Sequence, residues 1–450
     1  MTLTTPKATS PAKRPVSETH LDLGPEAEAF RDEVREWLAA NAPDELVGVD
    51  VERALFGDGP GIKEWTAKLH EAGLLCVAWP KEYGGRGLTG IEVSVLNDEF
   101  ARAGVPRVTR GMGEWLVGPS IIVWGTDEQK AHFLPRIIDG TDRYCQGFSE
   151  PDAGSDLASL KTRGVVDGDE VVITGQKVWT SGATVANMMF CLCRTDPDAP
   201  KHQGISYVLT PMKRPDGSNN GFELRPIRQP TGSSHFTETF ITDARAPLFN
   251  VIGGLNNGWR VTMTTLGNER GGNATTQHVQ YTKQFWDAVD VVRDKGLDDD
   301  PLVRQELAWA YTHCEIMRIR GLQILSEVVA RKEPGPAASI NKMFWSEYAQ
   351  RFSERMMNIR GAEAMITPDP KPPTDGNGSA SGDAFDSGPG YALDKWQQSF
   401  LGTRSATIWG GTAQVQRNIV GERVLGLPKE PSSKPPTPAA NGDEAKAVPA

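Results

Sequence analysis

The sequence predicts an α+β protein with a helical N-terminal domain, a middle β-sandwich or β-barrel domain and a C-terminal helical bundle. Three observations support this order. Apolar residues recur at helical spacing up to about Tyr144. Short runs rich in β-branched and aromatic residues then alternate with Gly, Pro, Asp and Asn. Helical spacing returns after Gly258 and continues through long segments, as in a bundle of antiparallel helices.

Domain boundaries follow from the same changes of pattern. The N-terminus is rich in Ser, Thr and Pro and lacks an apolar signal segment, so we expect a disordered tail rather than a secretory signal or a transit peptide. The far C-terminus is rich in Pro and Ala and is expected to be disordered as well. The predicted parts are a tail over 1–21, the N-terminal α-helical domain over 22–144, the middle β-domain over 145–250, the C-terminal bundle over 251–427 with a mobile insert at 366–390, and a tail over 428–450.

Individual elements can be assigned within these domains. Helical apolar spacing predicts helices over 30–38, 62–72, 91–103, 127–138, 259–293, 302–332, 338–363, 393–408 and 413–424. Short β-rich runs predict strands near 171–174, 188–195, 204–212, 221–227 and 235–247.

Composition excludes several classes of function. The chain has 450 residues, a net charge of −10 and a pI near 5.4, which argues against a general nucleic-acid binder. No apolar run reaches the roughly 18 residues that a membrane span needs. The five cysteines form no CxxC pair, and Cys191 and Cys193 have no partner at metal-ligand spacing. We therefore expect no metal site, and buried, reduced cysteines in a cytoplasmic protein.

Two hydroxyl-rich segments are the strongest candidates for a binding site. They are QGFSEPDAGSD (146–156) and GQKVWTS (175–181), with an Asp-Gly turn at 167–168 between them. An aromatic wall, short donors and glycines suit a flat, partly polar ring. A β-hairpin with one buried Trp fits this segment equally well.

Three other motifs have both a functional and a structural interpretation. The G-x-G-x-x-G at 85–90 lacks a preceding strand and a βαβ context, so it predicts a glycine-rich turn rather than a nucleotide site. The Gly-Gly-Thr turn at 410–412 either binds a phosphate or begins a helix capped by Thr412. Glu269 and Arg270 in LGNERGGN are either solvated surface charges or a carboxylate beside a dry pocket, where burial of a carboxylate raises its pKa toward that of a useful base.

The chain resembles the acyl-CoA dehydrogenases over roughly residues 22–427. The matching motifs occur in the order of that family and are WPKEYGGRGL (79–88), GTDEQKAHFLPRIIDG (125–140), GFSEPDAGSDLASLKTR (147–163), GQKVWTS (175–181) and GGTAQVQRNIVGERVLGLP (410–428). The resemblance implies the fold of that family with a C-terminal four-helix bundle, and FAD as cofactor. It also implies dehydrogenation of an acyl-CoA thioester to the trans-2-enoyl-CoA, with the electrons passed to an electron-transfer flavoprotein.

Site residues are implied by the same resemblance. Phe148, Ser149, Gly154 and Ser155 are expected to line the flavin or the thioester side of the site, with Ser155 and Arg270 on the substrate. Trp179 is expected to stack on the flavin ring, and Thr180 and Ser181 to hydrogen-bond its polar edge. Thr412 and Gln414 are expected to meet the pyrophosphate or adenosine end of FAD.

Departures from the family pattern direct the remaining predictions. Many members carry the catalytic Glu where this chain has Gly410; other branches carry it in an L-x-x-E-R context, which makes Glu269 the predicted base for the α-proton. The GGT motif resembles a bacterial branch that acts on bulky thioesters, including sterol side chains. The family's Arg-Lys-x-Phe-Gly segment is absent, and some relatives with this change form α2β2 heterotetramers with half the flavin sites.

We therefore expect a homo- or heterotetramer. A flavin-holding or scaffolding subunit and an oxygen-using flavoenzyme on the same fold are the alternatives.

Overall fold

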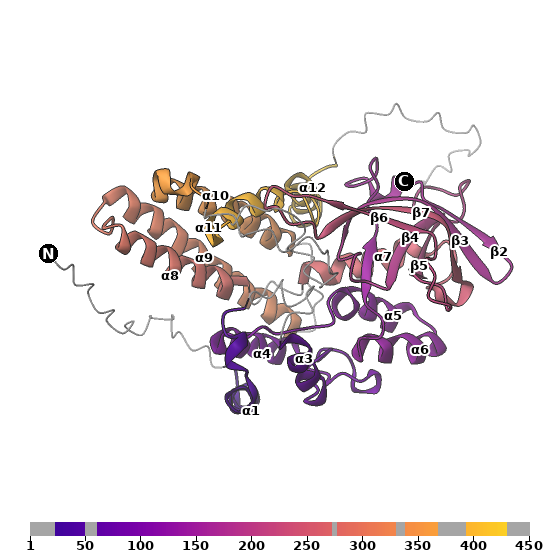
Figure 1. The fold of residues 1–450 in the computed structure, drawn as a ribbon, viewed down its shortest axis with the longest axis horizontal. Helices are drawn as coiled ribbons and strands as arrows, with labels where there is room; N and C mark the ends of the chain where they lie inside the picture. The colour runs from indigo at the N-terminus through magenta and orange to yellow at the C-terminus, as the bar shows by residue number, and fades with distance from the viewer. Residues whose placement is uncertain (1–22, 50–60, 272–276, 330–337, 368–392, 430–450) are drawn as a thin grey trace, which may run out of the picture.

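The protein folds in the predicted α–β–α order, which confirms the fold class (Figure 1). The computed structural model describes residues 23–49, 61–271, 277–329, 338–367 and 393–429. The predicted tails at 1–21 and 428–450 and the predicted insert at 366–390 lie almost entirely outside these ranges. Seen from two sides, the sheet occupies one end of the molecule, the long C-terminal helices the other, and the N-terminal helices lie along both.

The N-terminal helices enclose an apolar core around Trp65, whose Nε1 donates to the Pro106 carbonyl at 2.9 Å. Thr89 and Thr126 each begin a helix with a reciprocal capping box, which supplies acceptors for otherwise unpaired N–H groups. The elements are α1 (Pro25–Asn41), α3 (Ile62–Glu71), η2 (Lys81–Tyr83), α4 (Gly90–Ala103), the π-helix η3 (Gly113–Val117), α5 (Gly118–Trp124) and α6 (Asp127–Ile138).

The middle segment is one mixed sheet in the order β6-β7-β3-β2-β4-β5-β8, with β1 paired to β4. The sheet curls so that β5 and β7 also contact each other. Asp167 pairs with Glu170 across the β2–β3 hairpin, where Gly168 has a φ of 63°, so the predicted Asp-Gly turn is confirmed. The strands are β1 (Tyr144–Gly147), β2 (Arg163–Asp167), β3 (Glu170–Ser181), β4 (Met188–Arg194), β5 (Ile205–Pro211), β6 (Phe222–Ile227), β7 (Phe236–Pro247) and β8 (Val251–Ile252).

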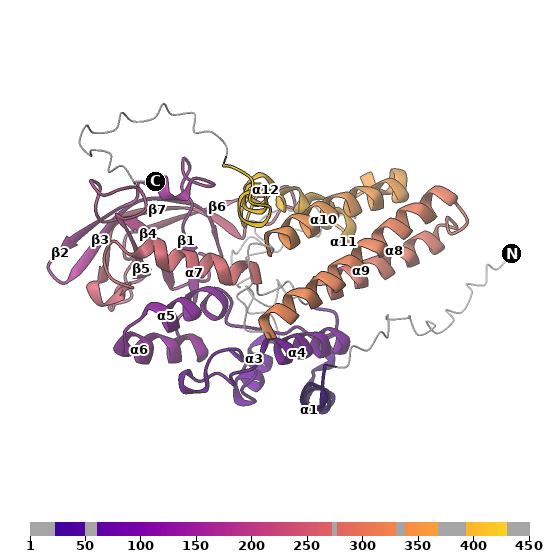
Figure 2. The ribbon, with the colours of Figure 1, turned by 180° about the vertical axis from the view of Figure 1, so that it is seen from behind.

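The C-terminal helices pack around an aromatic core in which the Tyr348 ring is stacked against both Trp309 and Phe352. Helix α7 is the exception, because it lies between the sheet and the N-terminal helices, in contact with α5 and β5 (Figure 2). The span predicted as one helix over 259–293 contains two helices on either side of 272–276, which is not described. The elements are α7 (Gly258–Gly271), α8 (Gln277–Asp294), α9 (Pro301–Val329), α10 (Ala338–Arg360), α11 (Lys395–Gly402), α12 (Ala413–Ile419) and the π-helix η8 (Val420–Val424).

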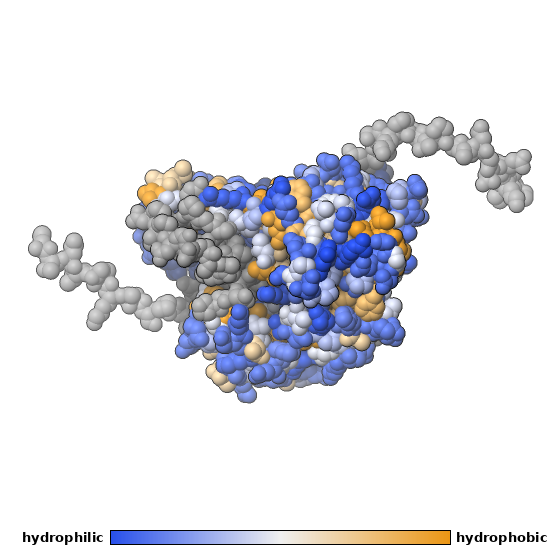
Figure 3. Space-filling view, turned by 45° about the vertical axis from the view of Figure 1, so that its right-hand side comes forward, coloured by the Kyte–Doolittle hydropathy of each residue, from blue (hydrophilic) through white to orange (hydrophobic). Residues whose placement is uncertain are grey.

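The remaining structural predictions can also be compared with the fold. All five cysteines are buried and free, as expected. The G-x-G-x-x-G at 85–90 follows the short helix η2 and leads into α4, so within the described residues it is a turn and not part of a βαβ unit. None of the helices in the described ranges combines the length and apolarity needed to cross a bilayer. Hydrophilic residues predominate on the face drawn in Figure 3, with hydrophobic residues in small patches.

Candidate functional site

The two hydroxyl-rich segments meet at strand β3. The second of them, GQKVWTS, forms the last part of β3 and ends with it at Ser181. The Val178 N–H donates to the Ser149 carbonyl at 2.9 Å, so the 146–156 segment takes the place of a neighbouring strand at this point. Where β3 bonds to this segment, its regular pairing with β7 is interrupted. The interruption lies at Trp179.

Trp179 lies in a β-bulge with its side chain directed to solvent. Lys177 pairs with Thr239 and Thr180 with Thr237, so Val178 and Trp179 together oppose a single residue of β7. Trp179 has a φ of 60°, a conformation that costs a non-glycine residue about 1–3 kcal/mol. The residue is 58% exposed and its ring touches the edge of Phe236, at 6.2 Å between centroids. The β2–β3 hairpin of the alternative interpretation is present, but the predicted burial of its Trp is wrong.

Behind the bulge, Lys177 and Glu150 form a buried ion pair. Lys177 Nζ donates to Glu150 Oε1 at 2.9 Å and to the Phe148 carbonyl at 3.1 Å. The Glu150 carboxylate also accepts the main-chain N–H groups of Lys161 and Thr162, at 2.7 and 2.9 Å. Burial alone would raise the pKa of Glu150, but Lys177 and these N–H groups outweigh it and hold the pKa below its ordinary value. The sequence interpretation missed Lys177.

The other predicted residues of the 146–181 region occupy different environments. Phe148 is a core residue, packed edge-on against Phe190 and Tyr207. Thr180 is fully buried, and its hydroxyl accepts a hydrogen bond from Thr239 at 3.2 Å. Gly154 and Ser155 are exposed, whereas Ser149 and Ser181 are half-buried. The contacts expected of these residues with a flavin or a substrate stay predictions.

Helix α7 carries the predicted base in its last turn. Thr265 and Ser120 share a hydrogen bond of 2.8 Å between their hydroxyls, and Trp124 Nε1 donates to the Thr264 hydroxyl at 2.9 Å. These contacts fix the middle of α7 against α5. Glu269 follows Thr265 by one helical turn. The side chains of Glu269 and Arg270 lie outside the described part of the structure, so their roles stay predictions.

The Gly-Gly-Thr turn is fixed by hydrogen bonds from side chains of the C-terminal helices. Gly410 and Gly411 have φ values of 64° and 86°. Lys342, which is buried on α10, donates through Nζ to the Gly411 and Ala406 carbonyls, both at 2.9 Å. Gln416 Nε2 donates to the Gly410 carbonyl at 3.0 Å.

Thr412 caps α12 by accepting the Val415 N–H at 3.1 Å, and Gln414 is exposed. The structural interpretation of Thr412 is therefore confirmed, while its contact with FAD stays a prediction. Sequence reasoning missed Lys342 and Gln416.

The exposed end of β3 and the turn before α12 face the same part of the molecule. Ser181 pairs with Phe236, which follows the loop between β6 and β7. In that loop the Thr231 methyl group lies against Gly402, 3.8 Å from where a Cβ would stand. Figures 1 and 2 both show α12 beside the end of β6.

The chemistry of this region fits the predicted FAD. The exposed Trp179 ring offers an aromatic face for a planar ring, and Ser155 and Ser181 offer hydroxyls that solvent reaches. In the part of the chain that the structure describes, a Cβ added to Gly154 would meet no atom within 4 Å, so the 146–156 segment leaves open space beside it.

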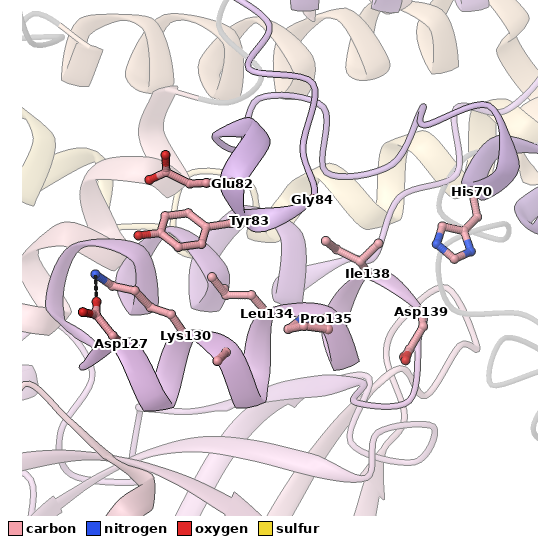
Figure 4. A pocket seen from close by; sticks show the side chains of 11 residues that line it. His70, Glu82, Tyr83, Gly84, Asp127, Lys130, Leu134, Pro135, Ile138 and Asp139 are labelled. Atoms are coloured by element: carbon pink, nitrogen blue, oxygen red, sulfur yellow. Dashed lines mark ion pairs between the residues drawn. The ribbon is translucent and has the colours of Figure 1, made fainter.

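A separate cavity of about 660 Å³ opens between η2 and α6 (Figure 4). Lys130 crosses it between Asp127, at 3.5 Å, and the face of Tyr83. None of the predicted site residues is among those that line it, so the cavity is distinct from the candidate site. The lining residues are His70, Glu82, Tyr83, Gly84, Asp127, Lys130, Ala131, Leu134, Pro135, Ile138 and Asp139.

Comparison with known proteins gives consistent results along the chain. Three family models match in order: acyl-CoA dehydrogenase N-terminal domain at 24–141, middle domain at 145–244 and C-terminal domain at 256–425. The acyl-CoA dehydrogenase IpdE1 of Mycobacterium tuberculosis is 39% identical over 414 residues, covering 90% of this chain and 99% of the relative.

Solved structures agree with these matches. The Tcur3481-Tcur3483 steroid ACAD superposes with a TM-score of 0.73 at 33% identity, covering 90% of this chain and 98% of that one. The ChsE4-ChsE5 complex from Mycobacterium tuberculosis gives 0.72 at 30% identity, with 90% and 99% coverage.

Proposed function

Because the chain belongs to the acyl-CoA dehydrogenase family and is an oxidoreductase of that class, we propose that it binds FAD at the Trp179 face of β3 and oxidises an acyl-CoA thioester to the trans-2-enoyl-CoA. The observation that carries the proposal is the exposed Trp179 ring, held in a left-handed conformation beside the 146–156 segment. An exposed aromatic ring on a costly backbone conformation is typical of a residue kept for a ligand rather than for the core.

Trp179 would hold the flavin ring, with Ser155 and Ser181 at its polar edge and Thr412 and Gln414 toward the phosphates. When bound, FAD supplies the acceptor for the hydride that leaves the β-carbon of the substrate. Thr180 is buried and bonded to Thr239, so we expect it to contribute through its main chain rather than its hydroxyl.

Glu269 would act as the base that removes the α-proton. The α-proton of a thioester is weakly acidic, so its removal needs a carboxylate held next to it and exclusion of water. The contacts of Thr264 and Thr265 with α5 support this role, because they fix the helix on which Glu269 lies. Arg270 and Ser155 would contact the substrate.

The substrate proposed is a thioester with a bulky acyl group, such as one derived from a steroid. The Tcur3481-Tcur3483 protein is named as a steroid ACAD, and it is similar to this chain along its whole length. An electron-transfer flavoprotein would take up the electrons.

The direct experiment is anaerobic addition of acyl-CoA thioesters to the purified protein. A panel running from short branched chains to steroid side chains should include at least one that bleaches the bound flavin and yields the enoyl-CoA. A flavin-loaded protein that no thioester reduces would overturn the proposal. Oxygen uptake during turnover without an added electron acceptor would instead favour the oxygen-using alternative.

A second candidate is a heteromeric enzyme in which this chain is one of two kinds of subunit. It is supported by solved neighbours that are named as pairs of proteins, and by the absence of the family's Arg-Lys-x-Phe-Gly segment. Flavin per subunit in the chain purified alone separates the two candidates. One FAD per chain in a homotetramer favours a homomeric enzyme, and little or no FAD favours a heterotetramer.

A further inference from the structure

We propose that Lys177 and Glu150 form a positioning pair that holds the Trp179 bulge against the 146–156 segment, and so sets the affinity of the site for its flavin. The inference rests on the proposed function, since it assumes that the flavin lies on the Trp179 face. Neither residue is expected to touch the flavin or the substrate.

The pair joins the two segments at their closest approach. Lys177 is on β3, one residue before the Val178–Trp179 bulge, and its side chain is 0% exposed. Its Nζ reaches both the Phe148 carbonyl and Glu150, which are the residues on either side of Ser149. Ser149 in turn accepts the Val178 N–H. Three consecutive residues of one segment are therefore bonded to two consecutive residues of the other.

Glu150 extends this link beyond the 146–156 segment, to the residues that precede β2. Its carboxylate accepts the main-chain N–H groups of Lys161 and Thr162, where the chain enters β2. The carboxylate thus closes the 150–162 loop on itself. Neutral side chains of similar shape would leave these N–H groups and the ammonium group without their charged partners.

An ion pair at this position needs an explanation other than stability. Lys177 lies on the inward side of β3 with Val171 and Ile173, which belong to an apolar cluster that includes Cys191 and Val208. Buried ion pairs are often no more stabilising than apolar residues of the same volume, and in some proteins their role is to specify one arrangement. The arrangement specified here is the bulge, because Lys177 and Thr180 are both held inward and Trp179 between them is exposed.

The test compares Lys177→Met with Lys161→Met. Lys161 lies in the 150–162 loop and its ammonium group pairs with Asp152 at the exposed surface, so it is a control with the same change of charge. In Lys177→Met we expect FAD affinity to fall at least tenfold. Amide exchange at Val178, Lys161 and Thr162 should rise at least tenfold, while amides of the β4–β5 pair remain protected. Lys161→Met should match the wild type in FAD affinity and in amide exchange.

Two further variants keep the test decisive. Val208→Ala removes apolar contacts in the same cluster, and it should lower the melting temperature yet retain FAD affinity and the visible circular dichroism of the bound flavin. If Lys177→Met does not fold, Glu150→Asp shortens the link by one methylene and keeps the charge. It should show the same loss of amide protection at Lys161 and Thr162, with an intermediate loss of affinity.

The outcomes separate this inference from the function on which it rests. A wild-type chain that binds no FAD on its own counts against the homomeric enzyme, and amide exchange in Lys177→Met then still tests the positioning pair. A wild-type protein that binds FAD, with wild-type affinity and amide protection in folded Lys177→Met or Glu150→Asp, overturns the positioning pair alone.

Discussion

The Ser149 carbonyl accepts the Val178 N–H at 2.9 Å, at the point where β3 loses its regular pairing with β7. This contact joins two sequence motifs that are separated along the chain by β2 and the first part of β3. The next residue, Trp179, is turned out of the sheet. The arrangement gives the protein an aromatic surface that contributes little to its core. The first prediction therefore tests whether Trp179 affects flavin binding more than it affects stability.

Replacing Trp179 should affect the flavin much more than the fold. Because the side chain is 58% exposed, Trp179→Ala should change the free energy of unfolding of the apoprotein by less than about 1 kcal/mol. Loss of an aromatic stack should weaken FAD binding by about 1 kcal/mol, or roughly fivefold. Trp179→Phe should retain most of the affinity. A large fall in apoprotein stability with unchanged FAD affinity would mean that Trp179 is a packing residue.

Glu269→Gln should retain FAD and lose turnover. The amide cannot accept the α-proton, so the rate of anaerobic bleaching by an acyl-CoA substrate should fall about a thousandfold. Glu422→Gln is the matched control, because Glu422 also precedes an Arg in a helical segment, η8. Bleaching by Glu269→Gln at the rate of the control would remove Glu269 as the base.

Periodicity in the sequence was sufficient to predict most elements of the fold. The predicted strands near 188–195 and 204–212 correspond to β4 and β5, and the predicted helices at 91–103 and 127–138 to α4 and α6. Such elements bury one side or stripe of regularly spaced residues, and that spacing is visible in the sequence. The bulge was not predictable in this way, because Trp179 is exposed through a change of partner made by a distant segment.

Lys177 could have been found from the sequence. The period of two that places Val171 and Ile173 inside β3 also places Lys177 inside. A lysine at an inward position requires a buried partner, and Glu150 was already part of the other motif. Phe148 could not be assigned in the same way, because an apolar residue beside a predicted pocket can equally face the core. The contacts of Lys342 depend on how α10 packs against the turn at 406–411, which local spacing does not encode.

The ion pair predicts a particular dependence on pH. In the wild type the pKa of Glu150 is lowered, so its contribution to stability is present above its unfolded pKa of about 4.3 and is lost as the pH falls further. In Lys177→Met the partner is gone, and we expect burial to raise the pKa of Glu150 above the unfolded value. The variant is then most destabilised at neutral pH. The difference in melting temperature from the wild type should shrink between pH 7 and pH 4, and a constant difference would contradict the assignment.

Lys342→Met should loosen the turn before α12. It removes the buried donor of the Ala406 and Gly411 carbonyls, and because Gly411 still accepts from Gln416 Nε2 at 3.5 Å, the main cost is roughly 1–3 kcal/mol for the unpaired Ala406 carbonyl. We expect a lower melting temperature and weaker binding of FAD. Lys395→Met is the control, because Lys395 forms an ion pair with Asp287 at the surface. Equal effects of the two variants on FAD affinity would show that the turn does not depend on Lys342.

Replacement by alanine should change the stability of the protein in opposite directions at two helical glycines, Gly118 and Gly267. A Cβ at Gly118 would lie 2.0 Å from Trp79 Cζ2, and Trp79 is buried with its Nε1 bonded to the Glu114 carbonyl at 3.0 Å. The ring has no room to move, so Gly118→Ala should destabilise the protein by about 3 kcal/mol. At Gly267, within α7, an added Cβ meets no atom of the described residues within 4 Å. Gly267→Ala should therefore raise stability by about 0.5–1 kcal/mol through helix propensity. Chemical denaturation of both variants measures these changes, and a stabilised Gly118→Ala would mean that α5 does not pack on Trp79 as described.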